Sequence, residues 1–153
     1  MTDGALELRV TRVDPRQLHD LRRRVLRGDD PDALVVDPRD DESTSRHFGG
    51  FLDGRLVVSA SFFPSPAPIN EQLTSMQLRF MATDADVQGR GLGSTLMGEA
   101  EEELRRMDVE QLWANGRDSA LPFYRSIGWS VVAGSEHLSA ETQLPHTVIY
   151  KIL

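Results

Sequence analysis

Residues 88–94 read Gln-Gly-Arg-Gly-Leu-Gly-Ser, with glycine at every second position. The segment lies between residues 76–83, which predict a strand, and a stretch from Leu92 whose apolar residues recur at helical spacing. Glycine lets the backbone approach a ligand closely and adopt dihedral angles that other residues avoid. The first N–H groups of a helix lack partners within the helix and carry the positive end of its dipole. This order therefore predicts a cradle for the phosphates of a ligand, with Arg90 as countercharge.

Three phosphate-binding patterns are candidates for this loop. A P-loop needs Gly-Lys followed by Ser or Thr, and the segment has no lysine. A Rossmann fingerprint needs G-x-G-x-x-G at the first strand of a βαβ unit, whereas these glycines have the spacing G-x-G-x-G in mid-chain. The pattern Q/R-x-x-G-x-G/A is matched by Gln88, Gly91 and Gly93. The structural alternative is a glycine-rich turn that only opens the helix.

The third pattern resembles the coenzyme A loop of the GNAT N-acetyltransferase superfamily, and residues 81–93 are similar to the family's strand-to-helix segment throughout. Residues 120–129 read Ala-Leu-Pro-Phe-Tyr-Arg-Ser-Ile-Gly-Trp and are similar to the family's second signature, A-x-x-F-Y-x-x-x-G-F, with Trp129 in the final aromatic place. Both signatures occur in the family's order and at its separation. The resemblance is strong over residues 76–129, and the N-terminal third matches by element order only. The chain thus resembles a small bacterial-type member of this family.

The elements that the sequence predicts also match an α/β fold of this kind. Asp14-Pro15 predicts the N-cap and first residue of a helix, and Asp53-Gly54 predicts a hairpin turn. Together with the resemblance, the order predicts one domain over residues 1–153, with a mixed, mostly antiparallel sheet flanked by helices, the GNAT-like acyl-coenzyme A fold. The predicted strands are residues 6–13, 48–52, 56–62, 76–83, 109–114, 129–133 and 147–152, and the predicted helices are residues 15–27, the stretch from Leu92, and residues 119–127.

The resemblance implies transfer of an acetyl group from acetyl-coenzyme A, as acyl donor, to a primary amine of a small molecule or peptide by direct attack. It places the pantetheine arm of the coenzyme along the backbone of Met81 and Thr83, like an added strand. A backbone N–H near Met81 would stabilise the oxyanion. The pyrophosphate would lie on Gln88, Gly89, Arg90, Gly91, Leu92, Gly93 and Ser94.

Tyr124 is the candidate general acid that the resemblance implies. A thiol has a pKa near 8.5 and a phenol near 10, so a tyrosine can protonate a departing thiolate. The structural alternative is a buried aromatic residue on a short helix. For the base, the place where some family members carry Glu is Gln77 here, and an amide cannot act as a base. His47 and His146 are candidates, beside a distant carboxylate acting through water or no protein base at all.

Two further regions are candidates for substrate contacts. Arg117 lies where the broader family commonly has an Asn that holds the pantetheine, and Asn115 is close by. Arg117 either reaches the coenzyme or an acidic substrate group, or is a solvated loop residue. Residues 29–42 contain seven acids, which either draw in a cationic amine or form a solvated loop. The basic run from Arg22 to Arg27 is interpreted as a solvated helix face.

Composition excludes several other classes. The chain has 153 residues, a net charge of −7 and no cysteine, so disulfides, thiolate metal sites and a cysteine nucleophile are excluded. No histidine pair has metal-ligand spacing, so no metal is expected. The acidity argues against nonspecific nucleic-acid binding. No membrane span of about 18 apolar residues or signal peptide is recognised, so the cytoplasm is the expected compartment. A homodimer is an assembly common among relatives.

Two other functions are alternatives to the acetyltransferase. One is a non-catalytic acyl-coenzyme A-binding or regulatory module, and the other is a nucleotide-dependent enzyme that uses the glycine loop for another phosphate.

Overall fold

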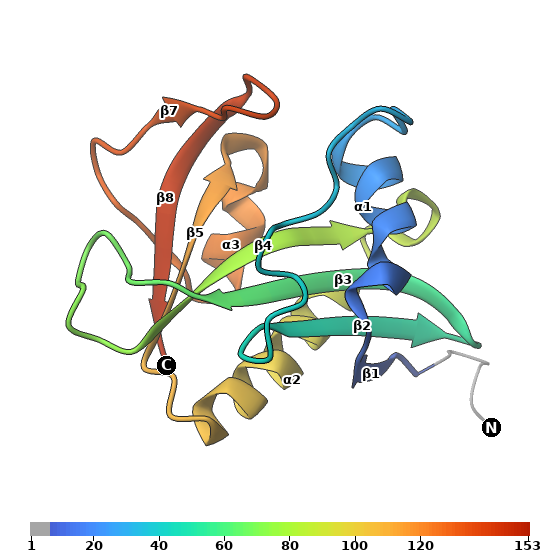
Figure 1. Ribbon diagram of the computed structural model, residues 1–153, viewed down its shortest axis with the longest axis horizontal. Coiled ribbons are helices and arrows are strands. Elements are labelled where there is room, and N and C mark those ends of the chain that lie inside the picture. Colours follow the sequence, from blue (N-terminus) through green and yellow to red (C-terminus); the bar gives the residue numbers. More distant parts are fainter. Residues whose placement is uncertain (1–6) are drawn as a thin grey trace. The chain divides into compact units, whose positions relative to one another are not determined.

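An eight-stranded mixed sheet and three α-helices make up the computed structural model, which describes residues 7–153 (Figure 1). The strand order is β1-β2-β3-β4-β5-β8-β6, and β7 also pairs with β8. The predicted α/β class with a mostly antiparallel sheet is confirmed. The strands are β1 (Arg9–Arg12), β2 (Arg46–Leu52), β3 (Arg55–Pro64), β4 (Ser75–Thr83), β5 (Gln111–Arg117), β6 (Ser130–Val131), β7 (His137–Leu138) and β8 (Pro145–Ile152). The helices are α1 (His19–Leu26), α2 (Leu92–Arg106) and α3 (Leu121–Ser126). Leu6, predicted to begin the first strand, lies outside the described residues.

The chain forms two compact units, and each is described by itself. The first unit contains residues 7–61 together with Phe80–Ala100, and the second contains Phe62–Arg79 together with Glu101–Leu153. Strands β3 and β4 and helix α2 each contribute residues to both units. No helix among residues 7–153 combines the length and the apolar character that a membrane crossing requires.

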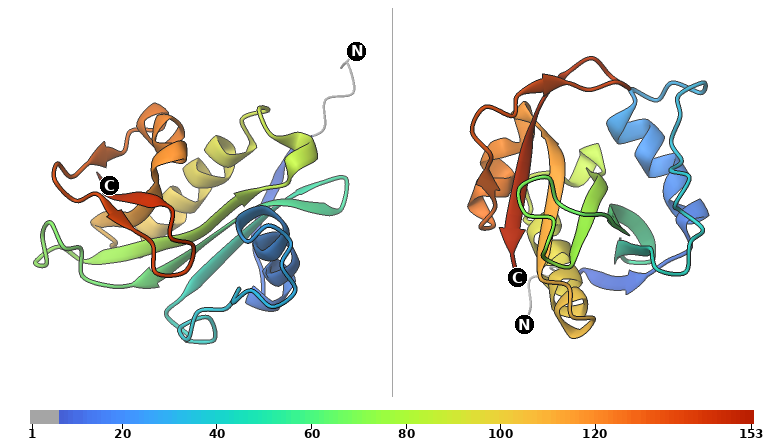
Figure 2. Two further views of the ribbon diagram at one scale, coloured as in Figure 1. Left: turned by 90° about the horizontal axis from the view of Figure 1, so that it is seen from above. Right: turned by 60° about the vertical axis from the view of Figure 1, so that its left-hand side comes forward.

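Local sequence signals position α1 in the first unit. Asp14 accepts a hydrogen bond from the backbone N–H of Arg16, and the side chain of Gln17 accepts one from the backbone of Asp14. This capping box starts a 3-10 turn that leads into α1. The 3-10 turn buries Leu18, and the helix buries Leu21. Figure 2 shows α1 and the segment after it on one face of β2.

The hairpin between β2 and β3 has the predicted turn. Asp53 and Gly54 both have positive φ, at 49° and 80°, as a two-residue turn between twisted strands requires. The irregular segment between α1 and β2 also lies in this unit.

Strand β8 is the centre of the second unit, where it pairs with β5, β6 and β7, all antiparallel. Strand β5 pairs in parallel with β4 on its other edge. Figure 1 shows the start of β8 beside the end of β5, where the chain continues into α3. Leu104, Leu112 and Ile149 are fully buried in this unit.

The structure corrects several boundaries and one orientation. Strand β5 starts two residues later and ends three later than predicted, because Val109 bonds back to the Leu104 carbonyl at the end of α2. Strand β6 is shorter than predicted, and the two-residue β7 was missed because its exposed residues show no alternation. The i,i+4 spacing of Glu101 and Arg105 predicts that Glu101 lies on the solvent side of α2, but its side chain is buried and accepts a 2.8 Å hydrogen bond from Lys151.

Candidate active site

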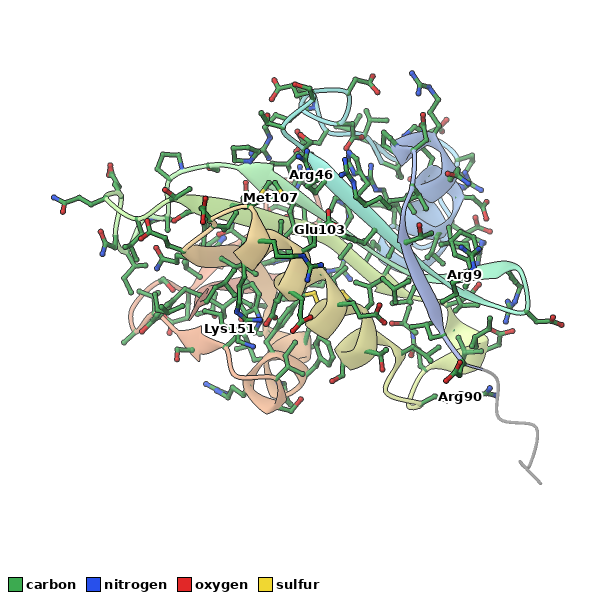
Figure 3. All side chains as sticks on the ribbon, turned by 90° about the horizontal axis from the view of Figure 1, so that it is seen from below. Arg9, Arg46, Arg90, Glu103, Met107 and Lys151 are labelled. Atoms are coloured by element: carbon green, nitrogen blue, oxygen red, sulfur yellow. The ribbon has the colours of Figure 1, made fainter. Side chains whose placement is uncertain are left out.

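The glycine loop before α2 adopts a conformation that glycine favours. Gly89 and Gly91 have φ of +81° and +76°, and no heavy atom lies within 4 Å of a Cβ built at either position. Both glycines and Arg90 are exposed. Figure 3 shows Arg90 on the loop that precedes α2, at the edge of the molecule. The loop therefore presents open backbone and an exposed countercharge, as a phosphate site needs.

The start of α2 leaves backbone donors available. The first turn is closed by the Gly91 carbonyl, which accepts 3.1 Å hydrogen bonds from both the N–H and the Oγ1 of Thr95. Among residues 7–153, no acceptor is recorded for the N–H groups of Leu92, Gly93 and Ser94. A 15-residue helix adds its dipole at this end. These donors fit the pyrophosphate of a coenzyme.

Strand β4 carries a local distortion just before Met81. Phe80 has φ of +59°, a strained conformation for an aromatic residue that costs about 1–3 kcal/mol. Its ring lies under the guanidinium of Arg22, 3.9 Å from ring centroid to Cζ. The side chain of Gln88 donates a 3.0 Å hydrogen bond to the Thr83 carbonyl. Strand end and glycine loop are therefore linked, and the structure brings all the predicted coenzyme-binding residues into the first unit.

Tyr124 lies on α3 in the second unit. It is buried between Phe123 and Trp129, with ring centroids 5.2 Å and 5.4 Å away. Its backbone carbonyl accepts from the N–H of Trp129, which closes the helix. No partner for its hydroxyl is recorded in residues 7–153, and this hydroxyl is not among the buried polar atoms that lack a partner. Burial raises the pKa of Tyr124, so the phenol keeps its proton.

His47 is held in a closed hydrogen-bond network in the first unit. Its Nε2 lies 2.8 Å from the backbone carbonyl of Asp40, which can only accept, so Nε2 carries the hydrogen. Its Nδ1 therefore accepts from the hydroxyl of Ser61, at 2.8 Å. Both ring nitrogens are used within the protein and the ring is buried. This arrangement gives His47 a structural role and not that of a base.

We expect His47 to make stability depend on pH. Burial lowers the pKa of His47 below its ordinary value of 6.5. The unfolded chain therefore takes up a proton on His47 at a higher pH than the folded chain does. The contribution of neutral His47 to the free energy of unfolding is complete above the unfolded pKa of 6.5, and it is lost as pH falls from there toward the pKa of the folded state. Between about pH 7 and about pH 5, the free energy of unfolding measured in urea should fall less for His47→Gln than for the wild type. His19→Gln is the control, and an unchanged pH dependence in His47→Gln would contradict the assignment.

His137 and His146 lie opposite each other in the second unit. His146, at the start of β8, is buried and pairs in register with the exposed His137 of β7. The Nδ1 of His146 lies 2.8 Å from the Leu144 carbonyl. The Nδ1 of His137 lies 2.9 Å from the Ser135 carbonyl. Both rings therefore carry hydrogen on Nδ1 when neutral, which leaves the lone pair on Nε2.

The remaining predicted positions are also in the second unit. Gln77 is half-buried on β4 and has no group that could act as a base. Arg117 ends β5 directly opposite His146, and Asn115 is exposed two residues earlier. Residues 7–153 contain no group of three or more His, Cys, Asp or Glu side chains that could hold a metal ion.

The buried Arg22 is a feature that sequence reasoning missed. Its side chain is fully buried, which corrects the interpretation of this basic run as a solvated face. It forms hydrogen bonds with Asp40 at 2.9 and 3.3 Å and with Ser61 at 2.9 Å. The only available signal was the acid-rich segment that follows, whose Asp40 neutralises the buried charge.

The acidic segment is largely paired with arginines of its own unit. Asp29, Asp37, Asp40 and Asp41 form ion pairs with Arg23, Arg39, Arg22 and Arg16, respectively. Fewer of its charges are therefore left to attract a cationic acceptor. That attraction stays a prediction.

Comparisons with known proteins agree with this geometry. The profile of the Acetyltransferase (GNAT) family matches residues 15–129. The Bacillus subtilis (strain 168) protein named Uncharacterized N-acetyltransferase YitI is 30% identical over 150 residues, covering 95% of this chain and 97% of its own length.

Solved structures share the fold at lower identity. A Lactobacillus plantarum protein aligns with a TM-score of 0.75 at 19% identity, covering 95% of this chain and 98% of that chain. Escherichia coli ElaA aligns with a TM-score of 0.73 at 18% identity, covering 96% and 99%. The profile match spans more than half of the chain and the curated relative matches nearly all of it, so the chain belongs to the GNAT family of acetyltransferases.

Proposed function

We propose that this enzyme transfers an acetyl group from acetyl-coenzyme A to a primary amine of a small molecule or peptide, within one domain over residues 1–153. The observation that carries the donor assignment is the start of α2, where the N–H groups of Leu92, Gly93 and Ser94 have no acceptor recorded in the described chain. The first N–H groups of a helix have no acceptor within the helix, and free donors behind an open glycine loop favour an anionic ligand.

In the proposed reaction the neutral amine attacks the thioester carbonyl carbon. The C–N bond forms, a backbone N–H near Met81 stabilises the oxyanion, and the C–S bond then breaks. The departing thiolate takes the proton of the Tyr124 hydroxyl, and the excess proton on nitrogen restores that hydroxyl. No covalent intermediate on the enzyme is needed, in agreement with the absence of cysteine.

A non-catalytic acyl-coenzyme A-binding module is the second candidate. It is favoured by Gln77, which stands where some relatives carry a carboxylate base. The tyrosine at position 124 argues against it, since it stands where the resemblance places the general acid of an active enzyme. An assay of coenzyme A release with a panel of amines distinguishes the two.

The donor assignment is tested by calorimetric titration with acetyl-coenzyme A, with ADP as the control ligand. We expect Gly91→Ala to raise the Kd for acetyl-coenzyme A by about tenfold or more, equal to about 1.4 kcal/mol, because the loop loses its positive φ. Gly134→Ala is the matched control, since Gly134 also has positive φ and open space around it but lies outside the loop.

Equal Kd values for Gly91→Ala and Gly134→Ala would show that the loop does not hold the coenzyme. A wild-type protein that binds acetyl-coenzyme A no more tightly than ADP would overturn the donor assignment itself.

A further inference from the structure

His146 has the features of a proton acceptor that is fixed in place by the backbone. Its Nδ1 is 2.8 Å from the Leu144 carbonyl, and a carbonyl can only accept, so this nitrogen carries the hydrogen. The lone pair of the neutral ring then lies on Nε2. No partner for Nε2 is recorded in the described part of the chain, and the residue is 8% exposed. A backbone-oriented imidazole with an available lone pair is the arrangement that a general base requires.

The position of His146 agrees with this role. It stands at the start of β8, opposite Arg117, the last residue of β5. The next residue, Thr147, donates a 2.7 Å hydrogen bond to Asp118, the first residue after β5, on the segment that leads into α3. Strand β8 is therefore tied to the turn that precedes the helix of Tyr124, within the same unit.

We propose that His146 is the general base that accepts the proton of the attacking amine through Nε2, an inference that rests on the proposed acetyl transfer. The ammonium form of the acceptor gives one proton to Nε2, which produces the neutral amine and an imidazolium that still donates from Nδ1 to Leu144. The imidazolium later returns this proton to water. His47 is unsuitable for this step because both of its ring nitrogens are already hydrogen-bonded.

The surroundings of His146 define the controls. The titratable groups at this level of the neighbouring elements are Arg117 on β5, Asp118 after β5 and His137 on β7. His137 has the same Nδ1 contact with a carbonyl, and its ring centroid lies 6.1 Å from that of His146. It differs in being exposed and is therefore the matched control.

The test compares His146→Asn with His137→Asn. Asparagine keeps a donor at the position of Nδ1, so the bond to the carbonyl is retained while the base is removed. At saturating acetyl-coenzyme A and acceptor, we expect His146→Asn to lower kcat about 100-fold or more and to lose the acid limb of the kcat–pH profile. His137→Asn should keep both, and added imidazole should partly restore His146→Asn. Calorimetry should give the wild-type Kd for acetyl-coenzyme A in each variant.

Two results would overturn the assignment: a His146→Asn profile that keeps the acid limb at near wild-type kcat, or an equal loss in both variants. A wild-type enzyme that binds acetyl-coenzyme A but acetylates no amine of the panel would instead contradict the proposed function. A His146→Asn protein that folds but binds no acetyl-coenzyme A would also contradict the assignment, because removal of a base for the acceptor amine leaves coenzyme binding intact.

Discussion

Tyr124→Phe is expected to lower kcat about 100-fold or more while acetyl-coenzyme A binds with its wild-type Kd. The substitution removes only the hydroxyl, for which no hydrogen-bond partner is recorded in the described residues. The ring keeps its contacts with Phe123 and Trp129, so folding and the position of α3 should be retained.

The effect should fall on kcat because the hydroxyl acts when the thiolate leaves. Burial raises the pKa of Tyr124, so the phenol is protonated throughout the range in which the enzyme is assayed. A thiolate that forms in a similarly dry environment is also destabilised, which raises its affinity for a proton. Burial thus raises the pKa of both the phenol and the thiol. A hydrogen bond from the phenol to sulfur therefore gains strength as the charge on sulfur develops.

The measurement is coenzyme A release followed with a thiol reagent, together with calorimetry of acetyl-coenzyme A. Tyr150→Phe, at the other tyrosine of the chain, is the matched control and should leave kcat unchanged. A Tyr124→Phe enzyme with kcat within twofold of the wild type would remove Tyr124 from the acid role. A loss of coenzyme binding as large as the loss of kcat would assign Tyr124 to binding.

Local sequence signals predicted the parts of the fold that local chemistry determines. The capping box at Asp14, the turn at Asp53-Gly54 and the positive φ of Gly91 each depend on a few neighbouring residues. The glycine loop was therefore placed correctly between its strand and its helix. Tyr124 was placed on a short helix for the same reason, since Gly128, with φ of +95°, ends that turn.

Contacts between distant segments were not predictable in this way. Arg22 lies in a run of arginines on a short helix, and such a run alone indicates a solvated face. What buries it are Asp40, Ser61 and the ring of Phe80, which lie far along the chain. The availability of His47 and His146 as proton acceptors was not predictable for the same reason, because only the tertiary structure shows which ring nitrogens are already bonded.

Arg22→Met is expected to lower the free energy of unfolding by about 3–5 kcal/mol, a large part of the ~5–15 kcal/mol of a typical domain. The substitution keeps most of the apolar stem but leaves the carboxylate of Asp40 buried without its countercharge. It also removes the cation over the ring of Phe80, the strained residue next to Met81. Urea unfolding followed by circular dichroism measures the loss.

Arg23→Met is the matched control, because Arg23 is the next residue of α1 and pairs with the exposed Asp20 and Asp29. Exposed pairs of this kind contribute less than about 1 kcal/mol. An equal loss in both variants would contradict a special role for the buried pair.

The double variant Arg22→Met with Asp40→Asn tests the cause of the loss and remains informative if Arg22→Met does not fold. Asparagine removes the uncompensated charge but keeps an acceptor for the backbone N–H of Asp37, which lies 3.1 Å from the Asp40 carboxylate. If the cost of Arg22→Met comes from an unpaired buried charge, the double variant must be more stable than Arg22→Met by about 1–2 kcal/mol, even though it carries one more substitution. If the loss in the double variant equals the sum of the losses in the single variants Arg22→Met and Asp40→Asn, the guanidinium stabilises the unit through its contacts with Ser61 and Phe80, and not through its charge.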